Sequence, residues 1–103
     1  MTENDLLLQI IELAHLYNWT VAHFRAGMNR RGEWATAVQG DGAGWPDLVL
    51  VKGSRLIFAE LKGETGDLSP EQYFWLTDLM STGAEVYLWT PDMWTEIQGV
   101  LTR

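Results

Sequence analysis

Two apolar runs separated by one turn signal constrain the fold of this chain more than any other feature. Residues 46–51 and 55–62 are each predicted to form a strand, and Gly53-Ser54 lies between them. Glycine at the first central position suits a two-residue type II′ hairpin turn. Both runs are apolar on both faces, as is typical of strands that helices cover. We therefore predict a hairpin within a sheet flanked by helices.

The turn also predicts where the charged residues of the hairpin lie. Pairing outward from Gly53-Ser54 places Asp47 opposite Glu60, and opposed residues share a face with Cβ atoms about 4.5 to 5.5 Å apart. Lys62 is two residues beyond Glu60 and therefore points the same way. Leu61 points to the other face, but its carbonyl lies between the two charged side chains. A slip of one residue would break this arrangement.

Two carboxylates this close suggest a chemical role. Asp47 and Glu60 stay ionised together only if a cation lies between them; otherwise one takes up a proton. Mg²⁺ prefers oxygen ligands and keeps several waters, which fits two carboxylates, a carbonyl and a phosphate. Such a metal lowers the pKa of a bound water and polarises a phosphoryl oxygen. Lys62 can hold or deprotonate the attacking water, or stabilise charge on the phosphate. The pattern predicts metal-dependent phosphodiester hydrolysis.

The segment before the hairpin divides into a helix, a strand and a loop. Residues 3–17 are predicted to form a helix because apolar residues recur at the three- and four-residue spacing of one face. Residues 19–25 alternate and are predicted to form a strand. Residues 26–44 are rich in glycine, so we expect a mobile loop in which only residues 33–39 could form a short strand.

Two helix starts carry capping signals. Thr2 can cap the first helix, with Asp5 three residues on as the partner of a capping box. The run 69–72, Ser-Pro-Glu-Gln, places serine at the N-cap, proline at the first helical position and glutamine at N3. This second helix is predicted to run to about Thr82 and to stop at Gly83.

The remaining residues complete an α/β order. Residues 84–89 are predicted to form a strand, and residues 90–101 a short final helix. The expected order is helix, strand, strand, strand, helix, strand, helix, with a mixed sheet flanked by helices. The 103 residues suffice for one domain, 1–103, and are too few for two.

Composition removes several classes of protein. The absence of cysteine excludes disulfides and thiolate metal sites. No stretch approaches the roughly 20 apolar residues of a membrane span. The first five residues are acidic and lack the basic start of a secretory signal. We therefore expect a cytoplasmic protein, in a bacterial or phage-infected cell given the resemblance described below.

The net charge of −7 at first argues against nucleic acid, because phosphate binding usually depends on a basic surface. However, Arg25, Arg30 and Arg31 lie close together in the chain, whereas the acidic residues are spread along it. Bound divalent cations would also cancel local negative charge. The acidity therefore bears on how tightly a nucleic acid binds, and it leaves that class of partner open.

The motifs resemble a known family. Pro46-Asp47, a second strand and then Glu60-Leu61-Lys62 are similar to the PD-(D/E)XK nuclease superfamily. Within it, residues 44–48 (Gly-Trp-Pro-Asp-Leu), the Glu-Leu-Lys triplet and residues 68–72 (Leu-Ser-Pro-Glu-Gln) resemble the VRR-NUC (virus-type replication-repair nuclease) branch. The resemblance extends over essentially the whole chain. It implies a restriction-endonuclease-like core of helix, three strands, helix and strand, which is the order predicted above.

The resemblance also implies roles for the site residues. Asp47 and Glu60 would ligate Mg²⁺ or Mn²⁺, the Leu61 carbonyl would join them, and Lys62 would be the catalytic lysine. Glu3 matches the acidic residue of the family's first helix. The structural alternative for Asp47, Glu60 and Lys62 is a surface ion pair, which usually contributes little to stability. For Glu3 the alternative is a favourable position at the positive end of a helix dipole.

Other residues have both a functional and a structural interpretation. Gln72 matches the glutamine of the family's helix after the lysine, although it is also a good capping-box residue. The candidate contacts to nucleic acid are Arg25, Arg30, Arg31 and His23, and the alternative for the arginines is an ordinary solvated loop. Trp45 near the site could stack on bases.

The leading hypothesis is a metal-dependent nuclease that hydrolyses DNA in phage or bacterial replication and repair. Branched or Holliday-junction-like DNA is among its candidate substrates, and endonuclease and exonuclease action both remain open. Size and resemblance together predict a homodimer. The alternatives are a catalytically silent nucleic-acid-binding module and a protein-interaction module with the same fold. Retention of both carboxylates and the lysine favours the enzyme.

Overall fold

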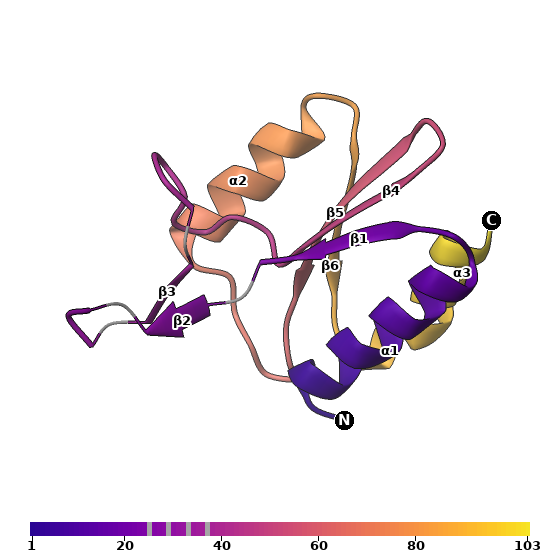
Figure 1. The fold of residues 1–103 in the computed structure, drawn as a ribbon, viewed down its shortest axis with the longest axis horizontal. Helices are drawn as coiled ribbons and strands as arrows, with labels where there is room; N and C mark the ends of the chain where they lie inside the picture. The colour runs from indigo at the N-terminus through magenta and orange to yellow at the C-terminus, as the bar shows by residue number, and fades with distance from the viewer. Residues whose placement is uncertain (25, 29, 33, 37) are drawn as a thin grey trace.

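The computed structural model describes residues 1–24, 26–28, 30–32, 34–36 and 38–103. The chain follows the predicted order of helix, strands, helix, strand and helix, with the short strands β2 and β3 added after β1 (Figure 1). The elements are α1 (Glu3–Leu16), β1 (Thr20–His23), β2 (Ala26–Met28), β3 (Trp34–Thr36), β4 (Leu48–Lys52), β5 (Arg55–Leu61), α2 (Pro70–Met80), β6 (Glu85–Trp89), the 3₁₀ turn η1 (Pro91–Met93) and α3 (Trp94–Thr102).

A four-stranded mixed sheet, in the order β1-β4-β5-β6, forms the centre of the molecule. The pairs β1–β4 and β4–β5 are antiparallel, and β5–β6 is parallel. The hairpin register is the predicted one, from Lys52 opposite Arg55 to Leu48 opposite Ala59. Gly53 has a φ of +60°, whereas Ser54 is not among the described residues of positive φ. This is the pattern of a type II′ turn, so the predicted turn is confirmed.

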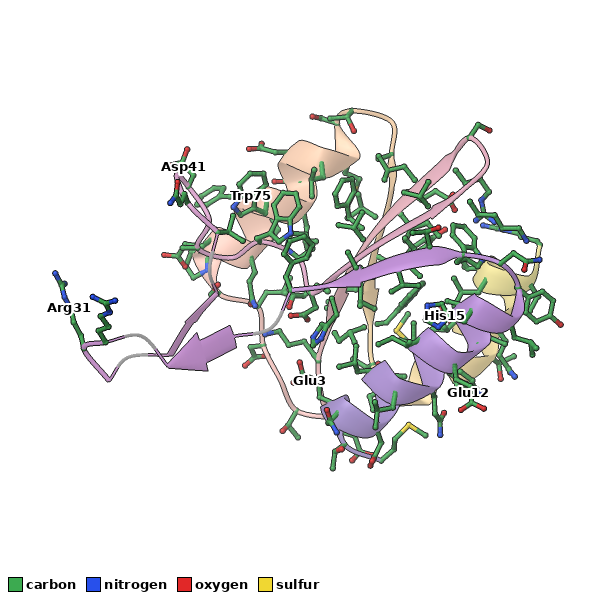
Figure 2. The ribbon with its side chains drawn as sticks, in the orientation of Figure 1. Glu3, Glu12, His15, Arg31, Asp41 and Trp75 are labelled. Atoms are coloured by element: carbon green, nitrogen blue, oxygen red, sulfur yellow. The ribbon has the colours of Figure 1, made fainter. Side chains whose placement is uncertain are left out.

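The glycine-rich segment contains a second, two-stranded antiparallel sheet. Its strands β2 and β3 pair with Gly27 opposite Ala35, and they project from the body of the molecule with Arg31 at the tip (Figure 2). The sequence prediction allowed a strand only at residues 33–39, so it missed β2. Three residues with glycine at the centre are too short to show alternation. Arg25, predicted to end the preceding strand, lies outside the described residues.

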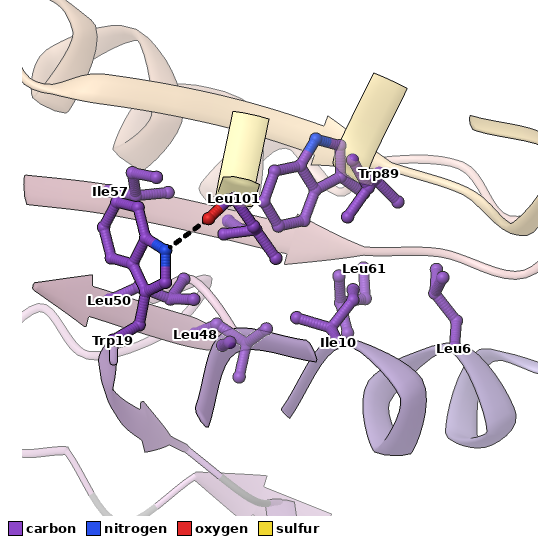
Figure 3. Packing of buried hydrophobic residues seen from close by; sticks show 12 residues of the cluster. Leu6, Ile10, Trp19, Leu48, Leu50, Ile57, Leu61, Trp89 and Leu101 are labelled. Carbon is purple, nitrogen blue, oxygen red and sulfur yellow. Dashed lines mark hydrogen bonds between the residues drawn. The ribbon is translucent and has the colours of Figure 1, made fainter. Parts of the chain in front are cut away.

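The main hydrophobic core lies between the sheet and the α1/α3 pair. Alternate residues of β4 and β5 point to this face and are fully or almost fully buried. Figure 3 shows them packed against α1 and α3. The buried cluster comprises Leu6, Ile10, Ala14, Trp19, Leu48, Leu50, Ile57, Ala59, Leu61, Trp89, Ile97 and Leu101. The helix α2 covers the other face, where Trp75 of α2 and Phe58 of β5 both contact Trp45.

Trp19, which directly precedes β1, is linked to the end of α3. Its indole Nε1 donates a buried hydrogen bond of 2.8 Å to the carbonyl of Leu101 at the end of α3 (Figure 3). The guanidinium of Arg55 lies 4.8 Å from the centre of the Trp19 ring and donates two hydrogen bonds to Glu85, of 2.9 and 2.7 Å. These contacts fix α3 against the sheet on the side away from Asp47.

Both predicted helix starts are confirmed. The Thr2 and Ser69 side chains each accept a hydrogen bond from the N3 backbone, and the N3 side chains Asp5 and Gln72 accept in return from the N-cap backbone. Gly83, with a φ of +88°, follows the end of α2 as predicted. Among the described residues, no helix has the length and apolar character needed to cross a membrane.

Candidate active site

Asp47 is held by the strands on either side of it. It directly precedes β4, so the observed register continues to place it opposite Glu60. Its backbone carbonyl accepts a 2.8 Å hydrogen bond from the amide of Phe24, next to β1. Its Oδ2 accepts a 2.8 Å hydrogen bond from the backbone amide of Leu61, at the end of β5. The carboxylate is thereby fixed at the point where three strands end.

Glu60 is the buried charge of the site. It is the one polar residue among the described buried ones, with 2% of its surface exposed. Its Oε1 accepts a 3.3 Å hydrogen bond from Nε2 of Gln72. Its Oε2 is buried and has no hydrogen-bond partner among the described residues. An unpaired buried carboxylate oxygen is costly, and a bound cation would remove that cost.

The electrostatics agree with this picture. Burial, together with the nearby Asp47 carboxylate, raises the pKa of Glu60 from an ordinary value of 4.5 to about 9, while the charge of Lys62 opposes the shift. Burial is the largest cause; once protonated, the Glu60 carboxyl can also donate a hydrogen bond to Asp47, which favours the neutral form further. Without a cation, the Glu60 carboxyl is therefore held neutral near pH 7.

Lys62 continues the β5 chain past its last strand residue. Its backbone amide donates a 3.0 Å hydrogen bond to the carbonyl of Trp89, which extends the pairing with β6. Its positive charge lowers the pKa of both Glu60 and Glu3, so the ammonium lies near both carboxylates. The ion pairs found in the described part of the chain do not include it. The Lys62 side chain is half-buried.

Glu3 approaches the site from the first turn of α1 (Figure 2). Partial burial and the Asp47 carboxylate raise the pKa of Glu3, and Lys62 lowers it. Glu3, His23 and Asp47 line one cavity of about 430 Å³, which Thr2, Asn4, Leu7, Phe24 and Leu61 complete. Two segments far apart in sequence, the start of α1 and the hairpin, thus meet at this cavity.

Gln72 serves the cap and the site at once. Its Oε1 accepts a 2.9 Å hydrogen bond from the Ser69 amide, so its Nε2 is the end that turns toward Glu60. The sequence left a capping role and a functional role open, and the structure shows that one side chain has both contacts. Gln72 therefore contacts the Glu60 carboxyl directly from the first turn of α2.

The donor set fits Mg²⁺ or Mn²⁺. Within the described part of the chain, no three His, Cys, Asp or Glu side chains are grouped to hold a metal. Two carboxylates, Asp47 and Glu60, are present instead. Mg²⁺ is commonly bound by one or two carboxylates together with waters and substrate phosphates, and it does not need an all-protein cage. Asp47 and Glu60 would hold such a cation, and Oε2 of Glu60 has no hydrogen-bond partner in the described part of the chain.

The structure separates the residues expected to contact nucleic acid. His23 lines the cavity beside Asp47. Arg30 and Arg31 are exposed in the turn between β2 and β3, and Figure 2 shows Arg31 at the far end of this hairpin from Glu3. The hairpin therefore does not bring the two arginines to the carboxylates. Arg25 falls outside the described residues.

An aromatic cluster behind the site was not predicted. Trp45 makes edge-on contacts with Phe24, Phe58 and Trp75, at centroid distances of 5.6, 5.7 and 5.0 Å. These contacts and the burial of its indole nitrogen hold the half-buried Trp45 against the helix and the sheet, and base stacking by Trp45 stays a prediction. Trp75 is three residues after Gln72 and so lies on the same side of α2, which is the signal that could have revealed the cluster.

Comparison with known families agrees with the geometry. The model of the VRR-NUC domain matches residues 6–92, which is most of the chain. Comparison with the curated proteins gave no match, and neither did comparison with the solved structures. The matched range includes Asp47, Glu60, Lys62 and Gln72, although it begins after Glu3. The chain therefore belongs to the VRR-NUC family, a branch of the PD-(D/E)XK nuclease superfamily.

Proposed function

We propose that this protein is a Mg²⁺- or Mn²⁺-dependent nuclease that hydrolyses DNA phosphodiester bonds. The observation that carries the proposal is the buried Glu60 carboxyl, whose Oε2 has no hydrogen-bond partner among the described residues, with Asp47 directly before the neighbouring strand β4. A carboxyl with a pKa raised to about 9 is poorly suited to a purely structural role. It is well suited to a divalent cation, which would return it to the charged form.

Each residue of the site has a distinct proposed role. Asp47 and Glu60 would hold the cation, with the Leu61 carbonyl as a further ligand. When bound, the metal would supply an activated water and polarise the phosphoryl oxygen. Lys62, near both carboxylates, would hold or deprotonate the attacking water, or neutralise charge on the phosphate.

The cavity supports roles for two more residues. Glu3, whose pKa is raised, lies where it can accept a hydrogen bond from a water or exchange a proton with it. His23 lines the same cavity and can donate a hydrogen bond to a phosphate oxygen. Both side chains reach the cavity from outside the hairpin, so they would act on the substrate and not on the hairpin fold.

Branched or Holliday-junction-like DNA is the substrate we favour, in bacterial or phage replication and repair. A homodimer would present two sites to a symmetric junction, and light scattering at high protein concentration tests that arrangement. A monomer under those conditions would remove this reason for favouring junctions. It would leave the hydrolytic chemistry untouched, because all the proposed catalytic groups lie in one chain.

The decisive experiment is cleavage of a DNA panel with and without divalent cation. Single strands, duplexes, flaps and four-way junctions are incubated with Mg²⁺, with Mn²⁺ and with EDTA. We expect cleavage of at least one substrate that EDTA abolishes and added Mg²⁺ restores. Labels at both ends of each strand distinguish internal cuts from terminal ones. Binding without cleavage in every metal would instead favour the catalytically silent module.

The two arginines of the β2–β3 turn give a separate prediction. Replacing Arg30 and Arg31 together with alanine is expected to weaken DNA binding about equally for all sequences and to reduce the slope of log K against log salt by about 1 to 2. The rate of the bound complex should change little, because the turn lies away from the carboxylates. Filter binding across a salt series measures the slope. Lys52→Ala on the β4–β5 hairpin is the control. An equal loss of DNA affinity in that variant would refute a specific role for Arg30 and Arg31.

A further inference from the structure

Gly44 makes the closest approach between the loop that leads to Asp47 and the helix α2. Its φ is +82°. A Cβ at this position would lie 2.5 Å from the backbone carbonyl carbon of Glu71, 2.6 Å from the backbone nitrogen of Gln72 and 2.7 Å from Cβ of Glu71. Two of these three atoms belong to the backbone of a helix, so they cannot move aside as the end of a flexible side chain can. Only glycine allows the observed packing.

The contact lies at the turn of α2 that carries Gln72. The amide nitrogen of Gln72 donates to Oγ of Ser69 at 3.1 Å, and its Oε1 accepts from the Ser69 amide at 2.9 Å. The same side chain reaches Glu60 through Nε2, at 3.3 Å. A backbone displacement at Gln72 would therefore pass directly to the hydrogen bond that holds one oxygen of Glu60.

We infer that Gly44 is a positioning residue of the proposed metal site. Its close packing places the first turn of α2 so that Gln72 holds Oε1 of Glu60 and leaves Oε2 available to the cation. This inference rests on the proposed function. Gly44 is three residues before Asp47, and Gln72 touches Glu60. The packing of Gly44 on α2 thus sets the two proposed metal ligands relative to each other across the sheet.

The chain offers a matched control for this contact. Gly83 has a φ of +88°, and a Cβ there would meet nothing within 4 Å. Gly44→Ala and Gly83→Ala impose nearly the same backbone strain, because both place alanine in the left-handed region. They differ in the clash with α2. Any difference between the two variants in metal binding therefore reports the packing of Gly44 and not the loss of glycine.

The experiment measures Mg²⁺ and Mn²⁺ binding to the folded variants by calorimetry. It also follows the side-chain amide resonance of Gln72 in the metal-free protein. We expect Gly44→Ala to weaken metal binding by about 10- to 100-fold, as is usual when a residue that orients a ligand is lost. The Gln72 resonance should shift in that variant. Gly83→Ala should keep wild-type metal affinity and the wild-type resonance, although its melting temperature falls.

A second variant keeps the test decisive if Gly44→Ala does not fold. Ser69→Ala removes the acceptor of the Gln72 amide and leaves Gly44 in place, so we expect metal binding to weaken by about 10-fold. Ser69→Thr retains a hydroxyl and should rescue it. Wild-type metal affinity in Ser69→Ala would overturn the inference even if Gly44→Ala does not fold.

The proposed function and this inference fail in distinguishable ways. If the wild-type protein binds neither Mg²⁺ nor Mn²⁺, the proposed function is wrong and the inference about the metal site falls with it, while the Gln72 resonance still reports whether Gly44 seats α2. If the wild type binds metal and cleaves DNA, but Gly44→Ala matches Gly83→Ala in both readouts, only the inference is wrong.

Discussion

Asp47→Ala is expected to abolish DNA cleavage, with a loss of at least about 1,000-fold in kcat/KM, because the variant loses one of only two carboxylates proposed to hold the cation. No other carboxylate can replace it, since the described residues contain no larger group of metal-binding side chains. Glu3, although close enough to influence the pKa values of the site, belongs to another element and reaches the cavity from α1. The assay is the DNA panel with Mg²⁺.

The fold of this variant should survive. The Asp47 side chain makes one described hydrogen bond, to the amide of Leu61, and a single such bond contributes about 1 kcal/mol. Asp47→Asn can keep this hydrogen bond but removes the charge, so it should be folded and inactive as well. Asp78→Ala, on the exposed side of α2, is the control and should cleave normally. Wild-type cleavage by the Asp47 variants would show that the site has been assigned wrongly.

Glu60→Gln is expected to stabilise the metal-free protein at pH 8 by up to about 5 kcal/mol while it eliminates cleavage. The carboxyl of Glu60 titrates near 4.5 in the unfolded chain and at about 9 in the folded one. Between these values the folded state binds more protons than the unfolded state, so the free energy of unfolding falls as the pH rises. Glutamine has no proton to lose and removes this dependence.

Urea unfolding in EDTA at pH 5 and pH 8 measures the effect. The wild type should be less stable at pH 8 than at pH 5 through Glu60, and the difference should shrink in Glu60→Gln. Added Mg²⁺ should stabilise the wild type at pH 8 by binding its folded state, and it should leave the variant unchanged. If the stability of the wild type depends on neither pH nor Mg²⁺, Glu60 is neither protonated nor a metal ligand.

Glu85 supplies a control of opposite sign. Hydrogen bonds from Arg55 lower the pKa of Glu85, so its stabilising contribution is present above the unfolded pKa of 4.5 and is lost as the pH falls through the folded value. Glu85→Gln should therefore destabilise the protein at pH 8, where Glu60→Gln stabilises it. The same pH series thus distinguishes Glu60, a buried acid without a paired cation, from Glu85, a carboxylate paired with Arg55.

Much of the site followed from local patterns in the sequence. Gly53-Ser54 predicted the turn, and the turn predicted the register that brings Asp47 to Glu60, since side chains alternate strictly along a strand. The capping boxes at Thr2 and Ser69 were predicted because a cap involves residues only three apart. Each of these features depends on neighbours in the chain, so composition and spacing were sufficient.

Other features depended on how α2 lies across the sheet, and only the tertiary structure decided them. Two of these features join segments far apart in sequence: the contact of Gly44 with residues 71 and 72 and the packing of Trp45 against Trp75. A third, the Oε2 of Glu60 without a hydrogen-bond partner among the described residues, depends on what those segments place around it. Glycine, tryptophan and glutamate each have many roles, and the sequence alone does not say which atoms will surround them. The sequence determined which charges share a face. Packing between distant segments decided that one of them, Glu60, is buried and has a raised pKa.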